Sequence, residues 1–468
     1  MRLLPVLLAI LYTINLISTI HVLAFIMENH IRCFDDISKK VFNDEGVTTN
    51  SSSEQKYVEN LILKIYKQFE QKASIDPDLP KLYKNAHAKF LKNALISLPQ
   101  SYTCLDASRP WLIYWILHAM WALKDMPDAE TLSHTVSFLS QCQHKEGGYG
   151  GGPGQYSHLG TTYAAVNALS IIGTDEAYNS IDRSSLQKFL WTVREVDGSF
   201  AVHRGGEQDI RGAYCAVSIA KLTNTFTEAL FDKTAEWIVS CQTYEGGFGG
   251  CPGMEAHGGY AYCGIAALAL LNRTKLCDLE ALLRWCVNRQ TSVEGGFQGR
   301  TNKLVDGCYS FWQGAIFPII SAILAQDHKE MIETVLFNQG ALQEYIIVCC
   351  QAPDGGLIDK PGKTWTRTVE NISKVGYSDG VTDGQNTSFQ SSFDMGYCQG
   401  LKFGLDLGYK LAVEDEQQSY NLQGDIERPT DPRRINCQIC IDQTIISQNI
   451  VNLFNTQKEK NDVYVIKK

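Results

Sequence analysis

The sequence has no excess of basic residues: 42 lysines and arginines stand against 51 aspartates and glutamates among 468 residues, and the net charge is −9. This excludes a broadly cationic surface, and with it nucleic-acid binding inferred from net charge. Any anionic substrate must therefore meet basic residues that are gathered locally. With 44% hydrophobic and 20% charged residues, the composition is that of a globular protein rather than a disordered or fibrous one.

One stretch, Leu3–Ile26, lacks Asp, Glu, Lys and Arg altogether. Such a run is typical of a signal peptide or a membrane anchor. Polar side chains within it weaken it as a spanning helix, and Met27 offers an alternative start. Both interpretations stay open, so residues 1–26 are treated as a separate segment that precedes a helical region over residues 27–83.

The cysteines do not form an obvious set of pairs: there are 15 of them, scattered from Cys33 to Cys440, and several lie in apolar helical stretches. This favours reduced thiols in the cytoplasm over a disulfide framework. No histidine follows His328, so Cys437-x-x-Cys440 has no Cys/His partner downstream and is interpreted as incidental.

Glycine, by contrast, is abundant, with 38 residues. Much of it falls in a signature made of an acidic residue, two small residues and a hydrophobic one. The signature occurs at Glu146-Gly-Gly-Tyr149, Asp197-Gly-Ser-Phe200, Glu245-Gly-Gly-Phe248, Glu294-Gly-Gly-Phe297 and Asp354-Gly-Gly-Leu357. The first four acidic residues are 51, 48 and 49 residues apart. A period of about 50 residues indicates stacked supersecondary units.

Each signature separates two helical stretches. The stretch before it is amphipathic, and the paired glycines end it because glycine tolerates positive φ and costs about 1 kcal/mol inside a helix. The stretch after it is small or apolar nearly all round, which is typical of an inner layer. The sequence therefore predicts an all-α fold, an α/α toroid over residues 84–412. An open helical solenoid used as a binding scaffold is the alternative that the repeat leaves open.

Polar groups recur just before the inner stretches. Each of the first four inner stretches begins with a leading aromatic residue, seventeen positions after the acidic residue of its signature: Tyr163, Tyr214, Tyr262 and Phe311. Five residues before each leading aromatic stand His158, Asp209, His257 and Asp306, and three residues before it stand Gly160, Arg211, Gly259 and Cys308. In a closed ring these positions would converge on one cavity, as a catalytic site requires.

Four motifs identify a family resemblance: Asp106–Trp115, Gly150–Tyr156, Gly253–Tyr260 and Glu294–Trp312. They closely resemble the β subunit of protein farnesyltransferase. The resemblance runs from about residue 50 through Lys363 and resumes near Tyr397. It implies the toroid fold and a reaction that joins a farnesyl group to the cysteine of a C-terminal CaaX motif. An insertion at about 364–392 and a tail over 413–468 that closes on the toroid complete the expected organisation.

The resemblance implies one zinc ion per β subunit, which would hold the substrate thiol as a thiolate. Asp306 and Cys308 match the family's first two ligands. The third family ligand is a histidine, and the matching position here holds Asp394, with Asp379 and Asp383 as alternative ligands. Asp359 matches a carboxylate that assists magnesium during diphosphate departure.

The resemblance also assigns the substrate contacts. Residues expected to act in catalysis are Asp306, Cys308, Tyr309, His257 and Lys303. Contacts to farnesyl diphosphate are expected from His257, Gly258, Gly259, Tyr260, Arg300, Thr301, Asn302, Lys303, Tyr309, Trp312, Arg211, Tyr214 and Cys263, and Arg211 also resembles a peptide-side contact. Trp111 and Trp115 match the apolar trough, and Trp111 and Tyr397 match positions that limit prenyl chain length.

The implied partners are a farnesyltransferase α subunit, farnesyl diphosphate and CaaX-terminated proteins, with no nucleic acid. The expected location is the cytoplasm, with membrane association through residues 1–26 left open. Two alternatives remain: a geranylgeranyltransferase β subunit, and a noncatalytic relative with a degraded zinc site. A terpene cyclase of the same architecture is disfavoured because the sequence has no Asp-x-Asp-Asp motif.

Overall fold

The computed structural model describes residues 32–76, 79–327 and 336–359, together with 398, 400–406, 408–409, 412–413 and 455–461 near the C-terminus. The chain divides into two compact units, Met1–Val369 and Glu370–Lys468. Both the N-terminal segment 1–26 and the expected insertion at 364–392 lie outside the described residues. Among the residues that the structure describes, no helix is both long and apolar enough to span a bilayer.

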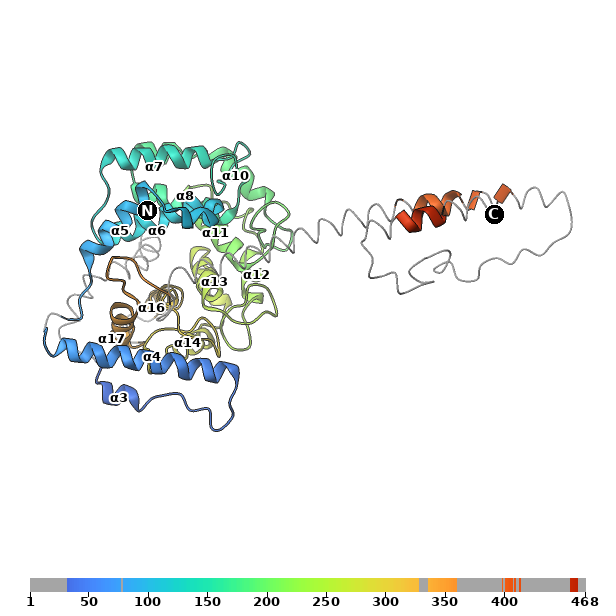
Figure 1. Cartoon of the computed structure of the whole chain (residues 1–468). Helices are drawn as coiled ribbons and strands as arrows, with labels where there is room; N and C mark the ends of the chain where they lie inside the picture. The colour runs from blue at the N-terminus through green and yellow to red at the C-terminus, as the bar shows by residue number, and fades with distance from the viewer. Residues whose placement is uncertain are drawn as a thin grey trace. The chain divides into compact units, whose positions relative to one another are not determined.

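The first unit is built from two layers of helices (Figure 1). The inner helices are α6 (Arg109–Ala122), α8 (Leu159–Ile172), α11 (Ile210–Leu222), α13 (Gly258–Leu270), α15 (Tyr309–Trp312) and α16 (Ile316–Asp327). The outer helices are α5 (Lys84–Ile96), α7 (Ala129–Cys142), α10 (Arg183–Thr192), α12 (Thr234–Ser240), α14 (Leu279–Val287) and α17 (Gln339–Glu344), which continues into the π-helix η3 (Tyr345–Cys350).

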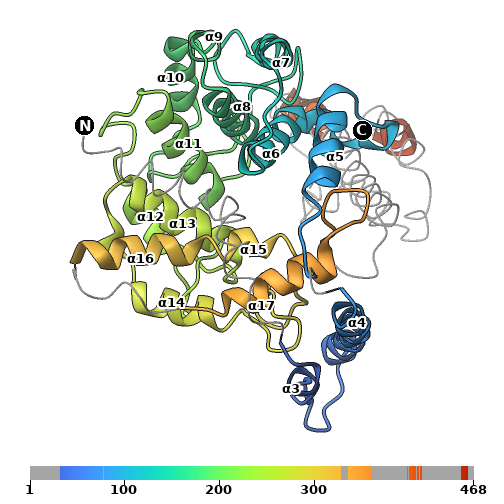
Figure 2. The same ribbon diagram turned by 90° about the vertical axis from the view of Figure 1, so that its left-hand side faces the viewer.

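The remaining elements connect or flank these layers: α3 (Phe34–Ser38), the long helix α4 (Asn50–Ala73), the 3₁₀ helix η1 (Gln100–Ser108), α9 (Asp175–Asn179) and the 3₁₀ helix η2 (Thr274–Leu276). Figure 2 shows α8, α11 and α13 following one another round the unit, with α7, α9 and α10 outside. The inner helices pack closely because small residues such as Ala164, Ala213 and Ala266 are fully buried between them.

The signature turns need glycine for two reasons. The first glycine of each turn has a positive φ, between 85° and 103°. A Cβ there would also strike the backbone at or near the start of the next outer helix: at Gly246 it would lie 2.2 Å from the Ala281 carbonyl oxygen. Only glycine satisfies both conditions. The same arrangement occurs at Gly147, Gly198, Gly295 and Gly355.

A glutamine before most signatures fastens each turn to the next unit. The Gln242 side chain accepts a hydrogen bond from the Asp278 N–H at 2.9 Å and donates to the Asp278 carbonyl at 2.8 Å. Gln290 makes the same pair of bonds with Asn338, at 2.9 and 2.8 Å. Gln143 accepts from the Asp182 N–H at 2.9 Å. The neighbouring units are therefore joined by backbone-directed hydrogen bonds as well as by apolar packing.

The fifth signature returns to the first outer helix. Gln351 accepts from the Tyr83 N–H at 2.8 Å and donates to the Lys81 carbonyl at 3.1 Å, just before α5. The Gly356 N–H donates to His87 Nδ1 at 3.0 Å within α5. The last described turn thus contacts the helix that begins the series. The closed toroid is confirmed, and the open solenoid is excluded.

Candidate functional site

The polar residues that recur in the sequence occupy equivalent places at the N-termini of the inner helices. His158, Asp209 and His257 are the N-caps of α8, α11 and α13. Each side chain accepts a hydrogen bond from the N–H two residues later, at 2.9, 2.8 and 3.1 Å. Asp306 accepts from the Cys308 N–H in the same way, at 2.9 Å. The same local hydrogen bond thus orients all four side chains. His257 and Asp306 line one cavity, whereas His158 and Asp209 are not among its lining residues.

Backbone hydrogen bonds hold these N-termini at one mouth of the toroid. The first N–H of an inner helix donates to a carbonyl in the loop of the next unit: Ile210 to Gly250 at 2.9 Å, and Gly258 to Gly299 at 2.7 Å. The Gly307 N–H donates likewise to the Asp359 carbonyl at 2.7 Å. The Asp359 backbone is thereby brought beside the Asp306–Cys308 turn.

His257 and Tyr309 form a hydrogen-bonded pair, with 2.9 Å between Nε2 and the phenol oxygen. Because Nδ1 accepts from the Gly259 N–H, the neutral ring carries its proton on Nε2 and donates it to Tyr309. Burial, followed by the nearby Arg300, lowers the pKa of His257. Burial raises the pKa of Tyr309 to about 12. The phenol keeps its proton near neutral pH and can donate it to an anion.

The lowered pKa of His257 predicts a pH dependence of stability. The unfolded side chain titrates at about 6.5, and the folded one titrates lower, so its contribution is complete above about pH 6.5 and is lost as the pH falls through the folded value. We expect the parent's thermal midpoint to fall more between about pH 7 and about pH 5 than that of His257→Asn, in which an asparagine can still cap the helix. Equal falls in the two proteins would contradict this reading.

The basic residues lie on a short hairpin that Gln298 and Val305 close through an antiparallel bridge. Arg300 forms an ion pair with Glu255, and Thr301 donates to Glu245 at 3.0 Å. Lys303 is exposed at the same hairpin, and Asn302 has a left-handed backbone with φ of 60°. A neighbouring carboxylate thus holds the Arg300 guanidinium, and Lys303 adds a second positive charge on the same hairpin.

A cavity of about 1180 Å³ opens beside this hairpin. One wall contains His257, Arg300, Asn302, Lys303, Asp306 and Tyr309. Residues between Lys40 and Glu59, ahead of the first toroid helix, also line it. The resemblance singled out the six toroid residues named here, but nothing in the sequence indicated the lining from residues 40–59.

The aromatic residues divide into two groups. Trp111 is half-buried, with ring centroids 5.4 Å from Trp115 and 5.6 Å from Tyr163. Tyr260 lies between the His257 ring, 5.2 Å away, and the Arg211 guanidinium, 5.8 Å away. Trp312 is half-buried against Tyr262 and Phe311. These side chains retain surface that an apolar ligand can contact.

Tyr214 and Cys263 are buried, each only 4% exposed. The Tyr214 hydroxyl lies 3.0 Å from that of Tyr163 and 3.2 Å from that of Tyr262. Tyr163, Tyr214 and Tyr262 thus form a ladder that links successive inner helices. The seventeen-residue spacing predicted these leading aromatics, but not the hydrogen bonds between their hydroxyls.

The residues expected to bind zinc lie only partly within the described part of the chain. Asp306 and Cys308 stand on one turn, where the Asp306 carboxylate accepts from the Cys308 N–H. No group of three or more histidine, cysteine, aspartate or glutamate residues suited to a metal is found within the described part of the chain. Asp379, Asp383, Asp394 and Tyr397 lie outside that part, so a third zinc ligand and the Tyr397 role stay predictions.

Comparison with protein families divides the chain near the boundary of the two units. The model described as Prenyltransferase alpha-alpha toroid domain matches residues 82–368. A second model, described as Essential protein Yae1, N terminal, matches residues 376–414. The segment of the second match contains Asp394 and Tyr397. Glycine recurs in the same segment at every fourth position, at Gly396, Gly400, Gly404 and Gly408.

Known proteins agree with the first match. The chain is 38% identical over 380 residues to protein farnesyltransferase subunit beta of Arabidopsis thaliana, covering 69% of this chain and 79% of that protein. It is 42% identical over 307 residues to the Saccharomyces cerevisiae subunit, covering 64% and 68%. Geranylgeranyl transferase type-1 subunit beta of Arabidopsis thaliana is 31% identical over 315 residues, covering 60% and 80%.

A solved structure agrees in fold. The chain of Candida albicans protein geranylgeranyltransferase-I, complexed with GGPP, superposes with a TM-score of 0.52 at 24% identity, covering 62% of this chain and 89% of that one. This likeness supports the toroid architecture alone. With the toroid model matching most of the first unit and relatives of the same name at 38–42% identity, the chain belongs to the protein farnesyltransferase β-subunit family.

Proposed function

We propose that this chain is the catalytic β subunit of a protein farnesyltransferase, which transfers farnesyl from farnesyl diphosphate to the cysteine thiol of a C-terminal CaaX motif. One observation carries the proposal: His257, Tyr309, Arg300 and Lys303 line a single cavity with Asp306. Tyr309, oriented by His257, offers a hydrogen-bond donor to a diphosphate, and Arg300 and Lys303 offer positive charge. Asp306 lies two residues before Cys308 on the same turn. Higher identity to farnesyl than to geranylgeranyl relatives supports the fifteen-carbon donor.

The chain's own residues would stabilise the leaving group. As the bond between the prenyl carbon and the diphosphate oxygen breaks and the carbon–sulfur bond forms, negative charge grows on the diphosphate. The Tyr309 phenol, oriented by His257, donates a hydrogen bond to that charge. Arg300 exchanges Glu255 for a diphosphate oxygen, which keeps its guanidinium paired before and after binding. Lys303 adds a second positive charge from the same hairpin.

The donor set fits a zinc ion in part. Asp306 and Cys308 would hold it, with the third donor supplied from outside the described residues. When bound, zinc keeps the substrate thiol deprotonated near neutral pH. Asp359, tied to Gly307 through its carbonyl, would assist magnesium at the diphosphate. An aspartate as third ligand would add negative charge and weaken thiolate stabilisation relative to histidine.

We propose that the active form is a heterodimer with an α subunit, as the β-subunit names of the relatives suggest. Co-expression should yield a one-to-one complex, and incubation with farnesyl diphosphate and a CaaX peptide should add one farnesyl mass to the peptide. A peptide with serine in place of the cysteine should stay unmodified. Full activity of the β chain alone would remove the heterodimer from the proposal, and modification of the serine peptide would remove the thiol chemistry.

Trp111 is proposed to limit the prenyl chain length, together with Tyr397. Trp111→Thr should admit the twenty-carbon donor, because a large ring against Trp115 and Tyr163 is replaced by a small side chain. We expect the ratio of kcat/KM for the two donors to shift by about 10–200-fold. Trp191→Phe, on outer helix α10, is the control and should leave the ratio unchanged. An unaltered ratio in Trp111→Thr would remove Trp111 from this role.

A cytoplasmic location is proposed on the basis of the thiols. Cys142, Cys241 and Cys286 are buried without disulfide partners. A tagged chain should fractionate with cytoplasmic markers. Asn371-Ile-Ser373 and Asn386-Thr-Ser388 match the acceptor motif for N-linked glycans. A glycan on either asparagine would show instead that the chain enters the secretory pathway.

A further inference from the structure

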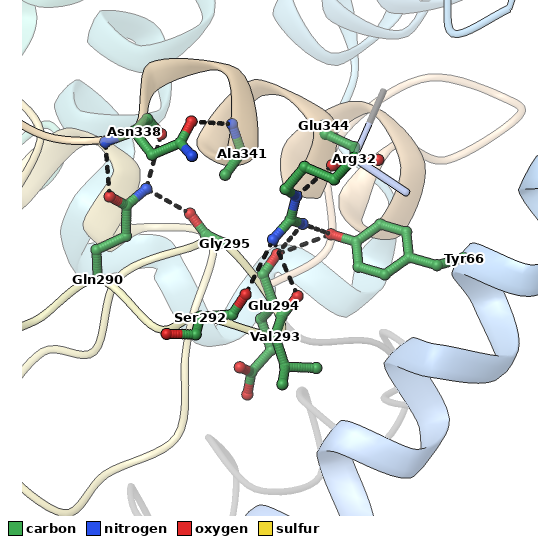
Figure 3. Close-up of polar contacts among 10 residues, drawn as sticks. All are labelled: Arg32, Tyr66, Gln290, Ser292, Val293, Glu294, Gly295, Asn338, Ala341 and Glu344. Carbon is green, nitrogen blue, oxygen red and sulfur yellow. Dashed lines mark hydrogen bonds and ion pairs between the residues drawn. The ribbon is translucent and has the colours of Figure 1, made fainter. Parts of the chain in front are cut away.

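The N-terminal arm, residues 32–73 with helices α3 and α4, holds the fourth signature turn through one arginine (Figure 3). The Arg32 guanidinium pairs with the Glu344 carboxylate at 2.5 Å. It also donates to the carbonyls of Ser292, Val293 and Glu294 at 3.1, 3.2 and 3.1 Å. The two charged side chains are only 16% and 5% exposed, so this is a largely buried ion pair, and the remaining Arg32 donors are satisfied by backbone carbonyls and by the Tyr66 hydroxyl.

Helix α4 contacts the same turn with two more side chains. Tyr66, 3% exposed, accepts from Arg32 at 2.9 Å and donates to the Glu294 carbonyl at 2.7 Å. The Gln55 amide bridges the buried carboxylates of Glu59 and Glu294, at 2.9 Å to each. The arm therefore holds Glu294 both by its carbonyl and by its carboxylate.

The turn that the arm holds leads directly into the diphosphate hairpin. An apolar cluster packs arm residues Ile37, Ile62 and Tyr66 against Val293 and Val305, together with Tyr345, Cys349 and Cys350. Val293 precedes the signature, and Val305 immediately precedes Asp306. The arm thus fixes both ends of the segment 294–305, which carries Arg300 and Lys303. Arm residues also line the cavity.

We propose that Arg32 is a positioning residue for donor binding. By holding the carbonyls of residues 292–294, it sets the hairpin so that Arg300 and Lys303 face the diphosphate. The proposal rests on the proposed function of that cavity, but goes beyond the toroid, since Arg32 and Tyr66 precede the family match that begins at residue 82. Its alternative is a purely structural ion pair, which would affect stability and nothing else.

Arg32→Lys separates these roles. Lysine keeps a positive charge opposite Glu344, so no buried charge is left without a partner, but it lacks the planar fork that reaches several carbonyls at once. We expect the KM for farnesyl diphosphate and its equilibrium dissociation constant to rise about tenfold. The kcat and the KM for the peptide should change less than about twofold, as for loss of ground-state binding.

Arg194→Lys is the matched control. Arg194 likewise donates to backbone carbonyls between units, to Leu230 at 2.9 Å and Asp232 at 3.1 Å, but in the second repeat. It should lower the thermal midpoint without changing donor affinity. If Arg32→Lys also lowers the midpoint and leaves donor affinity unchanged, Arg32 is structural and the proposal is wrong.

Two further measurements complete the test on the α/β complex. Tyr66→Phe removes one hydroxyl and keeps the ring, so it should raise the dissociation constant for farnesyl diphosphate about threefold even if Arg32→Lys does not fold. An unchanged constant in a folded Tyr66→Phe complex would count against the proposal. Binding of farnesyl diphosphate to the parent complex is measured first. If the parent binds none, the proposed function fails, and this inference fails with it. If the parent binds farnesyl diphosphate and both variants have the same dissociation constant as the parent, only the inference is overturned.

Discussion

We expect the α/β complex that carries Cys308→Ala to bind no zinc. Its kcat/KM should fall by more than roughly 10–100-fold, which is the cost of losing a residue that contacts only a metal ligand. Cys308 is exposed at the N-cap of α15, and its N–H is held by the Asp306 carboxylate at 2.9 Å. Zinc binds thiolate at about 2.3 Å and needs deprotonated donors. Alanine would leave Asp306 as the single donor on this turn. Metal content per complex is the primary measurement, and the farnesylation rate is the second.

Cys251→Ser is the control for this prediction. The Cys251 thiol donates to the Gln208 carbonyl at 3.0 Å, a contact that serine can keep, and we expect zinc and rate to stay at parent values. Asp394→Ala and Asp394→His then test the third ligand: loss of zinc in the first and retention in the second would support Asp394. Full zinc occupancy in Cys308→Ala would contradict the assignment of that thiol.

Gly246→Ala is expected to destabilise the toroid by at least about 3 kcal/mol. The residue has φ of 103°, and its new Cβ would lie 2.2 Å from the carbonyl oxygen of Ala281. The obstacle is backbone in the first turn of α14, so relief requires moving that helix. Such movement would also break the Gln242 bonds to Asp278. The midpoint of urea unfolding of the purified complex measures the effect.

Gly253→Ala separates backbone strain from the collision. Gly253 also has a positive φ, 83°, but a Cβ there would meet nothing within 4 Å. We expect a cost of only about 1–2 kcal/mol, from the left-handed backbone alone. Equal shifts of the two midpoints would show that close packing of the turn on α14 does not constrain the toroid.

Local periodic signals made the toroid predictable. The acidic-Gly-Gly signature fixed where outer helices end, and the spacing from it to the aromatic residue fixed where His158, Asp209, His257 and Asp306 stand. These four residues occupy equivalent positions in the repeat, and each side chain accepts a hydrogen bond from the N–H two residues later. Gln143, Gln242 and Gln351 each precede an acidic residue by three positions, so the same repeat contained a signal for the inter-unit bonds.

Contacts across long sequence separations were not predictable. The segment before α5 carries no signature, so nothing indicated that Gln351 would bond the backbone near Tyr83. Arg32 lies in a short polar segment whose partners are about 260 residues away, at Ser292 and beyond. Such contacts depend on how the closed ring presents its turns, and single-sequence patterns report only local geometry.

Farnesyl transfer by the purified α/β complex tests the account most directly, with the parent chain compared with the double variant Arg300→Gln/Lys303→Gln. We expect the parent complex to farnesylate a CaaX peptide. In the double variant, kcat/KM should be lower by about 10³-fold or more, because losing one donor that stabilises the transition state costs about 10²–10³-fold. Arg284→Gln, exposed on α14, is the control and should match the parent. The proposed function would be contradicted if a zinc-loaded parent complex transferred no farnesyl, or if the parent and the double variant had equal rates.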